Sequence, residues 1–265
     1  MPDTCVFCHG EGGMSREHVL PDWMSREFTE IAGNGARLLS LEQHSDPVGR
    51  SAYTIRHPYL RLKDDQRAFS RRAKVVCKSC NNGWMSRLEV NVRPTLARMA
   101  RGNSIALGTE EQTALAAWLL KTMLMEYKAP PAGPRTQQPP LMPQVDYTRF
   151  YSERTPSSEV RVALATMQPP RERPRLVFYD SMIDQMRSGD GTTGYCATLR
   201  LGYFVAQLLR IPDGVPEGTF ASVLEPSPHL VQLWPTTPIL LWPPPAPIHE
   251  HQWESFVRLP EGDLA

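Results

Sequence analysis

Two Cys-x-x-Cys pairs are the strongest chemical feature of the sequence. Cys5 and Cys8 form the first pair, and Cys77 and Cys80 form the second pair far downstream. Four thiolates at about 2.3 Å from one ion complete the tetrahedral shell of a structural zinc. Because sulfur takes all four positions, such an ion has no place for a reacting water. The spacing therefore predicts one structural Zn²⁺ per chain that joins the two pairs.

Three polar residues lie next to these cysteines in the sequence. Glu17 and His18 follow shortly after Cys8, and Asn81 directly follows Cys80. Since zinc would join the two segments, we expect these side chains to meet although His18 and Asn81 are far apart along the chain. Carboxylate and amide oxygens suit Mg²⁺ or Mn²⁺, and a neutral imidazole can take a proton from water. The combination is typical of metal-assisted phosphodiester hydrolysis.

Each of these residues also has an ordinary structural interpretation. His18 beside Glu17 could be a satisfied pair at a strand end, and Asn81 could be the N-cap of the helix that follows. His9, next to the first cysteine pair, is interpreted as a bystander because four cysteines already complete the site. Trp84 is expected to pack the following helix against the zinc site rather than to stack on a base.

The order of these motifs resembles a known family. Cys-x-x-Cys, Glu-His-Val-x-Pro and Val-Cys-x-x-Cys-Asn-x-Gly-Trp-Met, over about residues 5–90, look like the zinc-binding members of the HNH (ββα-metal) endonucleases. The resemblance implies His18 as general base, and Glu17 and Asn81 as ligands of a catalytic Mg²⁺ or Mn²⁺. The family usually has Asp where this chain has Glu17, and many members have His where Asn81 stands. The resemblance says nothing about residues 105–265.

Basic residues are concentrated in one part of a chain whose net charge is only +1. Residues 50–101 hold 13 Lys and Arg against 3 Asp and Glu. Such a local excess suits a polyanionic partner, for which nucleic acid, and DNA in particular, is the expectation; a solvated Arg-rich surface is the alternative. The residues expected to hold the nucleic-acid backbone are Arg61, Arg67, Arg71, Arg72 and Arg87.

Short elements are expected to position the N-terminal site. Residues 22–31 have the pattern of a helix, and residues 36–50 that of a loop. Residues 52–62 and the run into 74–76 suggest a β-hairpin that leads to the second cysteine pair. A helix should start near Asn81 and be ended or kinked at Pro94. These elements predict a zinc-binding, HNH-like nuclease domain over residues 1–104.

Residues 105–265 are predicted to form a second domain of unknown role. The capping-box pattern of Thr109–Gln112 precedes an apolar helix over 114–127, which we expect to be buried. A proline-rich connector covers 129–143. Further elements are expected as strands at 159–166, 175–179, 194–209 with a break at Gly202, 229–233 and 239–242, and as a helix near 250–257. The predicted fold class is α+β, in which a ββα-metal domain precedes an α+β domain with a mainly antiparallel sheet.

Composition narrows the class of protein. The sequence has no run of 18 apolar residues and no export signal at its start, so no membrane association and a cytoplasmic location are expected. In that reducing compartment the paired cysteines favour zinc over disulfides, and Cys196 is interpreted as a small buried apolar residue. Neither a G-x-S-x-G motif nor a phosphate-binding P-loop is present.

Three functions compete at this point. The first is a metal-dependent endonuclease, a hydrolase of nucleic acid. The second is a zinc-stabilised nucleic-acid-binding module whose nuclease-like site is inert. The third is a protein-interaction role of residues 105–265, including self-association into a homo-oligomer.

Overall fold

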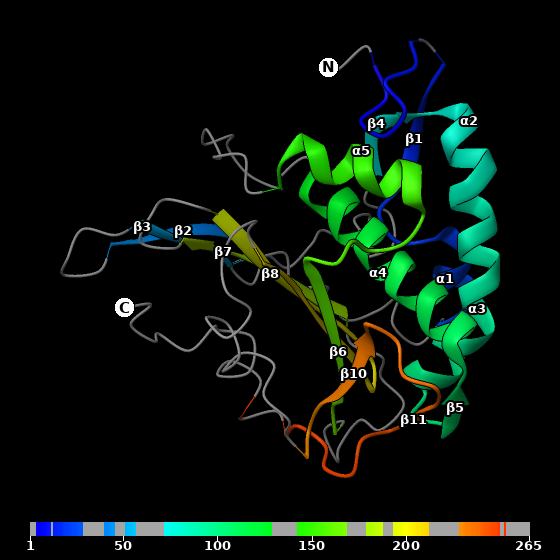
Figure 1. The fold of residues 1–265 in the computed structure, drawn as a ribbon, viewed down its shortest axis with the longest axis vertical. Coiled ribbons are helices and arrows are strands. Elements are labelled where there is room, and N and C mark those ends of the chain that lie inside the picture. The colour runs from blue at the N-terminus through cyan, green and yellow to red at the C-terminus, as the bar shows by residue number, and fades with distance from the viewer. Residues whose placement is uncertain are drawn as a thin grey trace.

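The protein is an α+β structure with helices packed against antiparallel sheets. The computed structural model describes residues 4–11, 13–28, 40–45, 51–56, 72–128, 142–168, 179–187, 193–211, 228–249 and 252. Figure 1 shows helices α3 (Ser86–Ala100), α4 (Thr109–Lys128) and α5 (Gln144–Glu153) together on one side, with the large sheet on the other. None of the described helices is long and apolar enough to cross a membrane.

A two-stranded antiparallel sheet carries the residues predicted to do chemistry. Its strands are β1 (Met14–His18) and β4 (Arg72–Cys77). The register places His18 opposite Arg72, and a β-bulge interrupts it after Ser15. Bulges of this kind re-aim side chains locally.

The predicted hairpin over residues 52–76 is wrong. The strand β3 (Ser51–Arg56) pairs with β2 (Ser40–Ser45) and with β7 (Tyr179–Arg187), not with β4. β2 also lies in the segment 36–50, which we expected to be a loop. β4 pairs with β1 instead because the first cysteine pair is fastened to it: the N–H of Val6 donates to the carbonyl of Val75 over 2.9 Å.

The helix after the second cysteine pair forms in three steps. It begins as α2 (Lys78–Cys80), continues as a π-helical turn, η3 (Asn81–Met85), and becomes α3. Gly83, with φ −93° and ψ −108°, departs from helical geometry inside η3. Pro94 is exposed within α3 and does not end it. β1, β4 and α3 thus form a strand–strand–helix unit with the cysteine pairs at one end (Figure 1).

The helix predicted over residues 22–31 is present but shorter. Helix α1 (Asp22–Glu27) buries Trp23 and Met24 against the core. Phe28 has φ −117° and ψ 60°, so the helix stops before it, and residues 29–31 lie outside the described residues.

The predicted buried helix is confirmed, but its capping box is wrong. Helix α4 begins at Thr109, and the carbonyl of Gly108 accepts the N–H of Gln112 over 3.0 Å. Gln112 therefore lies one position too late to cap the helix. Its side-chain amide instead donates to the carbonyls of Leu107 over 2.9 Å and Thr237 over 2.8 Å.

The large sheet has seven strands in the order β10-β6-β9-β8-β7-β3-β2. Its remaining strands are β6 (Val160–Thr166), β8 (Thr193–Leu201), β9 (Phe204–Arg210) and β10 (Val231–Trp234). The predicted break at Gly202 is confirmed, since this residue turns the β8–β9 hairpin with φ +61°.

Of the other strands predicted in the second half, those at 159–166 and 229–233 correspond to β6 and β10, whereas the one at 175–179 shares only Tyr179 with β7, which continues to Arg187. The strand expected at 239–242 is β11 (Leu240–Trp242), which pairs with β5 (Ile105–Leu107) in a separate two-stranded sheet. Residues 175–178, the connector up to residue 141, and the helix expected near 250–257, apart from residue 252, lie outside the described residues.

The larger of two hydrophobic clusters runs through most of the described structure. It includes Phe7 of the first cysteine pair, Leu96 of α3, Trp118 of α4 and Phe204 of β9, all fully buried. Helix α4 contacts α3 on one side and β9 and β10 on the other, so it is the central layer (Figure 1). The core therefore continues across residue 104, and the division into two domains stays a prediction.

Candidate metal centre and adjacent polar cluster

The four paired cysteines form one cluster. Their Sγ atoms all lie within 4.8 Å of one another, and those of Cys8 and Cys77 are 3.6 Å apart. Sulfurs at about 2.3 Å from a tetrahedral ion are about 3.8 Å from each other. The arrangement of Cys5, Cys8, Cys77 and Cys80 therefore fits one metal ion of the zinc type.

In each cysteine pair a backbone N–H donates a hydrogen bond to a sulfur atom, which favours the thiolate form. The N–H of Gly10 donates to Sγ of Cys8 over 3.4 Å, and the N–H of Cys80 donates to Sγ of Cys77 over 3.4 Å. Burial opposes ionisation of Cys77, but hydrogen bonds with Ser79 and the Cys80 amide lower its pKa to about 6. Burial raises the pKa of Cys8 and of Cys80. A bound cation would favour the thiolate form of all four.

An aromatic cluster fixes the first cysteine pair against the helices. The ring of Phe7 meets that of Trp84 edge-on at 5.3 Å between centroids, and Phe150 of α5 lies 5.6 Å from Trp84. The packing role predicted for Trp84 is thus borne out. His9 contacts Thr148 through Nε2 at 3.0 Å, so it faces α5 rather than completing the sulfur cluster.

Glu17 and Asn81 meet beside the cysteine cluster. Glu17 is 6% exposed, and hydrogen bonding with the Asn81 side chain acts to lower the pKa of its carboxyl. Nδ2 of Asn81 also donates to Oγ of Ser15 over 2.7 Å. Asn81 has helical angles, φ −57° and ψ −59°, so it is not the N-cap that the alternative interpretation required.

Burial dominates the electrostatics of Glu17. It raises the pKa of this carboxyl to about 7, against the favourable charge of Lys121, while the carboxylate of Glu89 raises the pKa further and the Asn81 hydrogen bond lowers it. At neutral pH Glu17 is therefore near the midpoint of its titration. A cation beside it would favour the ionised form.

His18 faces Arg72 across the two strands. Nε of Arg72 donates to Nε2 of His18 over 2.9 Å, so Nε2 is the acceptor and the ring proton belongs on Nδ1. Burial, together with the Arg72 charge, lowers the pKa of His18, which keeps the imidazole neutral at pH 7. The imidazole is thus in the protonation state of a base, with its lone pair directed at a guanidinium.

Two charged residues of the cluster were missed by sequence reasoning. Lys121 on α4 is fully buried, and its Nζ lies 2.7 Å from Oε1 of Glu89 on α3. A signal was available, because Lys121 is the only charged residue between Gln112 and Met125 of a helix already predicted to be buried. A buried ammonium requires a partner nearby.

The arginines predicted to contact nucleic acid divide into two groups. Arg72 and Arg87 are exposed, on β4 and α3 respectively. Arg61, Arg67 and Arg71 lie outside the described residues.

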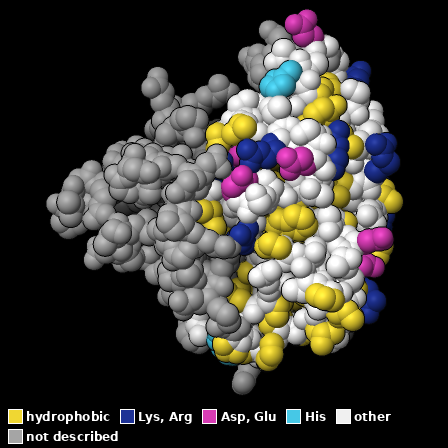
Figure 2. All heavy atoms as spheres, viewed as in Figure 1, with side chains coloured by type: hydrophobic (Ala, Val, Ile, Leu, Met, Phe, Trp, Pro, Cys, Tyr) yellow, Lys and Arg dark blue, Asp and Glu magenta, His cyan; other side chains and the backbone are white. Residues whose placement is uncertain are grey.

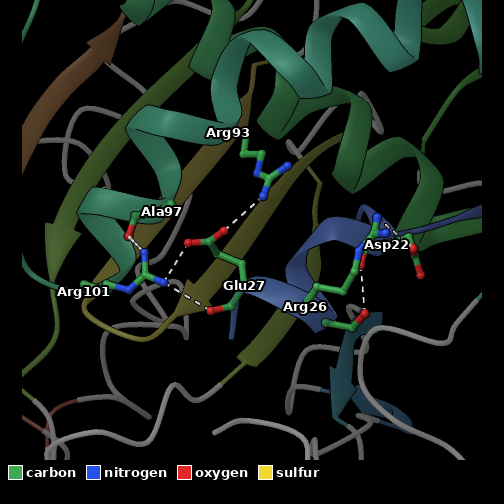
Figure 3. Close-up of polar contacts among 7 residues, drawn as sticks. Asp22, Arg26, Glu27, Arg93, Ala97 and Arg101 are labelled. Atoms are coloured by element: carbon green, nitrogen blue, oxygen red, sulfur yellow. Dashed lines mark hydrogen bonds and ion pairs between the residues drawn. The ribbon is translucent and has the colours of Figure 1, made fainter. Parts of the chain in front are cut away.

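Two other arginines of α3 fasten α1 to the strand–strand–helix unit (Figure 3). Arg93 contacts the Glu27 carboxylate at 3.2 Å and Arg101 contacts it at 2.8 Å, while Arg101 also donates to the Glu27 carbonyl over 3.1 Å. Their guanidinium groups also lie 5.3 Å from the rings of Trp23 and Phe28. Hydrogen bonds from Arg101 and Arg93 lower the pKa of Glu27. These contacts hold the segment that follows His18 onto α3.

Comparison with known proteins gives no match: no protein-family model fits the sequence, and no curated protein or solved structure is significantly similar to it. The functional conclusion therefore depends on the site itself.

Proposed function

We propose that this protein is a metal-dependent endonuclease of the HNH type. The observation that carries the proposal is the attachment of Asn81 to β1: its Nδ2 donates to Oγ of Ser15 over 2.7 Å, two residues before Glu17, with His18 next in the chain and the cysteine cluster alongside. Glu17 and Asn81 are distant in the sequence, yet the β1–β4 pairing and η3 bring them together. We assign a structural Zn²⁺ to the four cysteines.

His18 is assigned as the general base. Its neutral imidazole takes a proton from a water molecule, whose oxygen forms a bond to phosphorus while the bond to the 3′ oxygen breaks and that oxygen leaves. The lone pair of Nε2 must first be released by Arg72. A phosphate of the substrate would attract this exposed guanidinium and free the base.

Glu17 and Asn81 are assigned as the residues that would hold Mg²⁺ or Mn²⁺. A divalent ion there would neutralise charge on the phosphate and on the leaving oxygen. Asn81 now directs its Nδ2 toward Ser15. A flip of the side-chain amide exchanges Nδ2 for Oδ1 and would present an oxygen ligand without moving the backbone.

The surface charge around the site supports a polyanionic substrate. The strands β1 and β4 with helices α2 and α3 contain two carboxylates, of which Glu17 is buried and Glu89 is paired with Lys121. The same four elements also carry exposed basic residues that form no ion pair with Glu27: Arg16, Arg72, Lys74, Lys78, Arg87 and Arg98. On the face seen in Figure 2, Lys and Arg are interspersed with Asp and Glu.

A second candidate is a zinc-stabilised nucleic-acid-binding module without catalysis. The contact between Arg72 and His18 favours it, since it occupies the nitrogen that a general base needs. In this case nucleic acid would bind in a salt-sensitive way and stay intact.

Nicking of supercoiled plasmid separates the two candidates. We expect the zinc-loaded wild type to nick DNA with Mg²⁺ or Mn²⁺, and His18→Ala to lose at least roughly a hundredfold in rate. His249→Ala, which changes an exposed residue far along the chain, is the matched control. Equal nicking by His18→Ala would exclude the mechanism, and salt-sensitive binding without cleavage at any metal concentration would establish the binding module.

A further inference from the structure

Lys121 is a buried charged residue that the proposed reaction does not use. Its side chain has no exposed surface, and its Nζ lies 2.7 Å from Oε1 of Glu89. Burying an ammonium ion is costly, and an apolar side chain of similar volume often packs as well or better. Methionine or leucine would therefore satisfy the core of α4 at this position, so packing alone does not account for a lysine.

The packing of helix α4 brings the charge of Lys121 within range of the Glu17 carboxyl. Helix α4 packs against both α3, which carries Glu89, and β4, the partner strand of β1. The charges of Lys121 and Glu89 both act on the Glu17 carboxyl, with opposite sign. Lys121 is thus paired with one carboxylate, Glu89, and its charge acts on a second carboxyl, Glu17, which comes from a different element.

We propose that Lys121 is a positioning residue that holds Glu89 out of the site at Glu17 and Asn81 and sets the affinity of that site for a divalent cation. This inference rests on the proposed function, since it concerns the same site. With Lys121 present, Glu89 is engaged and the two carboxylates share one balancing charge. Without it, Glu17 and Glu89 would both attract a cation, and Glu89 would be released to become an additional ligand.

Equilibrium binding of Mn²⁺ tests the inference without relying on activity. Free Mn²⁺ is measured by electron paramagnetic resonance in zinc-loaded wild type, Lys121→Met, Lys121→Arg, Glu89→Gln and the double variant Glu89→Gln with Lys121→Met. Circular dichroism and thermal unfolding report whether each variant is folded, and Glu17→Gln identifies the Mn²⁺ bound at the proposed site.

The five proteins fall into three classes of expected Mn²⁺ affinity: tighter than wild type, weaker than wild type, and equal to it. Lys121→Met should bind Mn²⁺ at least roughly tenfold more tightly, because a neighbouring positive charge is lost, and Glu89→Gln should bind it roughly tenfold more weakly. Lys121→Arg keeps the charge and should resemble wild type. The double variant restores the net charge of the cluster and should also return to the wild-type affinity.

Unchanged Mn²⁺ affinity in folded Lys121→Met, or an affinity in the double variant that stays as tight as in Lys121→Met, would overturn the inference. If Lys121→Met does not fold, the test rests on Glu89→Gln alone. An unchanged Mn²⁺ affinity of Glu89→Gln would then overturn the inference. If the Mn²⁺ affinities shift as expected but no variant nicks DNA, the proposed function is wrong and the role of Lys121 is supported. If the protein nicks DNA but the affinities do not shift, only the role of Lys121 is wrong. If the wild type binds no Mn²⁺, both proposals are wrong.

Discussion

At the scale of single residues, the candidate site contains ionisable side chains that are buried, although such side chains are usually exposed. Glu17 is a carboxyl with almost no exposed surface, and Lys121 is an ammonium with none. Each is tolerated because a polar partner is within reach, Asn81 for the first and Glu89 for the second. Buried polar groups that cost stability are typical of functional sites rather than of ordinary cores.

Glu17 makes the stability of the protein depend on pH. Its pKa rises from 4.5 to about 7 on folding, so the folded state favours the protonated form. The resulting stabilisation is complete below pH 4.5 and is lost as pH rises through about 7, for a total of about 3 kcal/mol. Urea unfolding without added divalent ions should show wild type losing this amount relative to Glu17→Gln between pH 4.5 and about 8. Parallel pH profiles of the two proteins would contradict the burial of this carboxyl.

The sequence carries the identity of the site residues but not all of their partners. The cysteine quartet and the meeting of Glu17 with Asn81 follow from motif spacing, because two ligand pairs on one ion force their neighbours together. The contact between Arg72 and His18 does not, since it depends on the register of β1 against β4. Register is a long-range property that local periodicity does not encode.

At the scale of elements, the cysteine cluster joins the two strands to the helix. The first cysteine pair, the end of β4 and α2 converge on the same four sulfurs, and an ion shared among them would fix segments that are distant in the sequence. The β1–β4 pairing and the start of α3 should therefore depend on this metal.

Removing the second cysteine pair should remove the metal and the local fold. In the double variant Cys77→Ser with Cys80→Ser, we expect zinc content to fall from one ion per chain to near zero, because two ligands do not hold a structural zinc. Elemental analysis and circular dichroism measure the two losses. Cys196→Ala, which changes a buried cysteine outside the cluster, should keep its zinc. Retention of zinc by the double variant would show that other ligands bind it.

The attachment of α1 to α3 through Glu27 should be measurable as well. Glu27→Gln weakens two ion pairs that are partly exposed to solvent, and we expect a loss of about 1 kcal/mol in the free energy of unfolding. The loss should shrink at high salt because exposed pairs are screened. Asp22→Asn, which breaks the more exposed pair with Arg26 in the same helix, is the control and should cost less than about 0.5 kcal/mol. Equal losses in both variants would mean that Glu27 does not fasten the helix.

Elements formed by local patterning were predicted well, and those formed by distant pairing were not. Helix α4 and the break between β8 and β9 follow from an apolar run and from a turn glycine, both readable within a short window. The hairpin assigned to residues 52–76 failed because the expected partner strand was taken by β1, whose position is set by the cysteine pairs. The capping box failed because α4 begins one residue earlier than the motif requires, and the side chain of Gln112 is engaged by Thr237, which is distant in the sequence.

At the scale of the whole molecule, the strand–strand–helix unit and the large sheet share one core. Helix α4 is the layer between them, and most of its residues are buried. A unit that ends near residue 104 would leave the apolar face of α3 uncovered and would lack Lys121.

A fragment of residues 1–104 tests this directly. We expect the zinc-loaded fragment to lack a cooperative thermal transition and well-dispersed amide resonances, because the partners of Leu96 and Phe7 on α4 and α5 are missing. A longer fragment, residues 1–168, which adds both helices, is the control. A cooperative, well-dispersed fragment of residues 1–104 would support the two-domain division.

The π-helical turn η3 has a consequence for how insertions and deletions would act here. In this turn the N–H of Ser86 reaches back five residues to the carbonyl of Asn81, so the chain carries one residue more than an α-helical turn would. Deleting Asn82, which is exposed, would let the turn close as α-helix and leave α3 near its present rotation about its axis, because five residues of a wide turn cover nearly the same rotation as four residues of an α-helix. Glu89 would then still face Lys121. The wide turn therefore absorbs one residue without changing the angular phase between the metal centre and the helix.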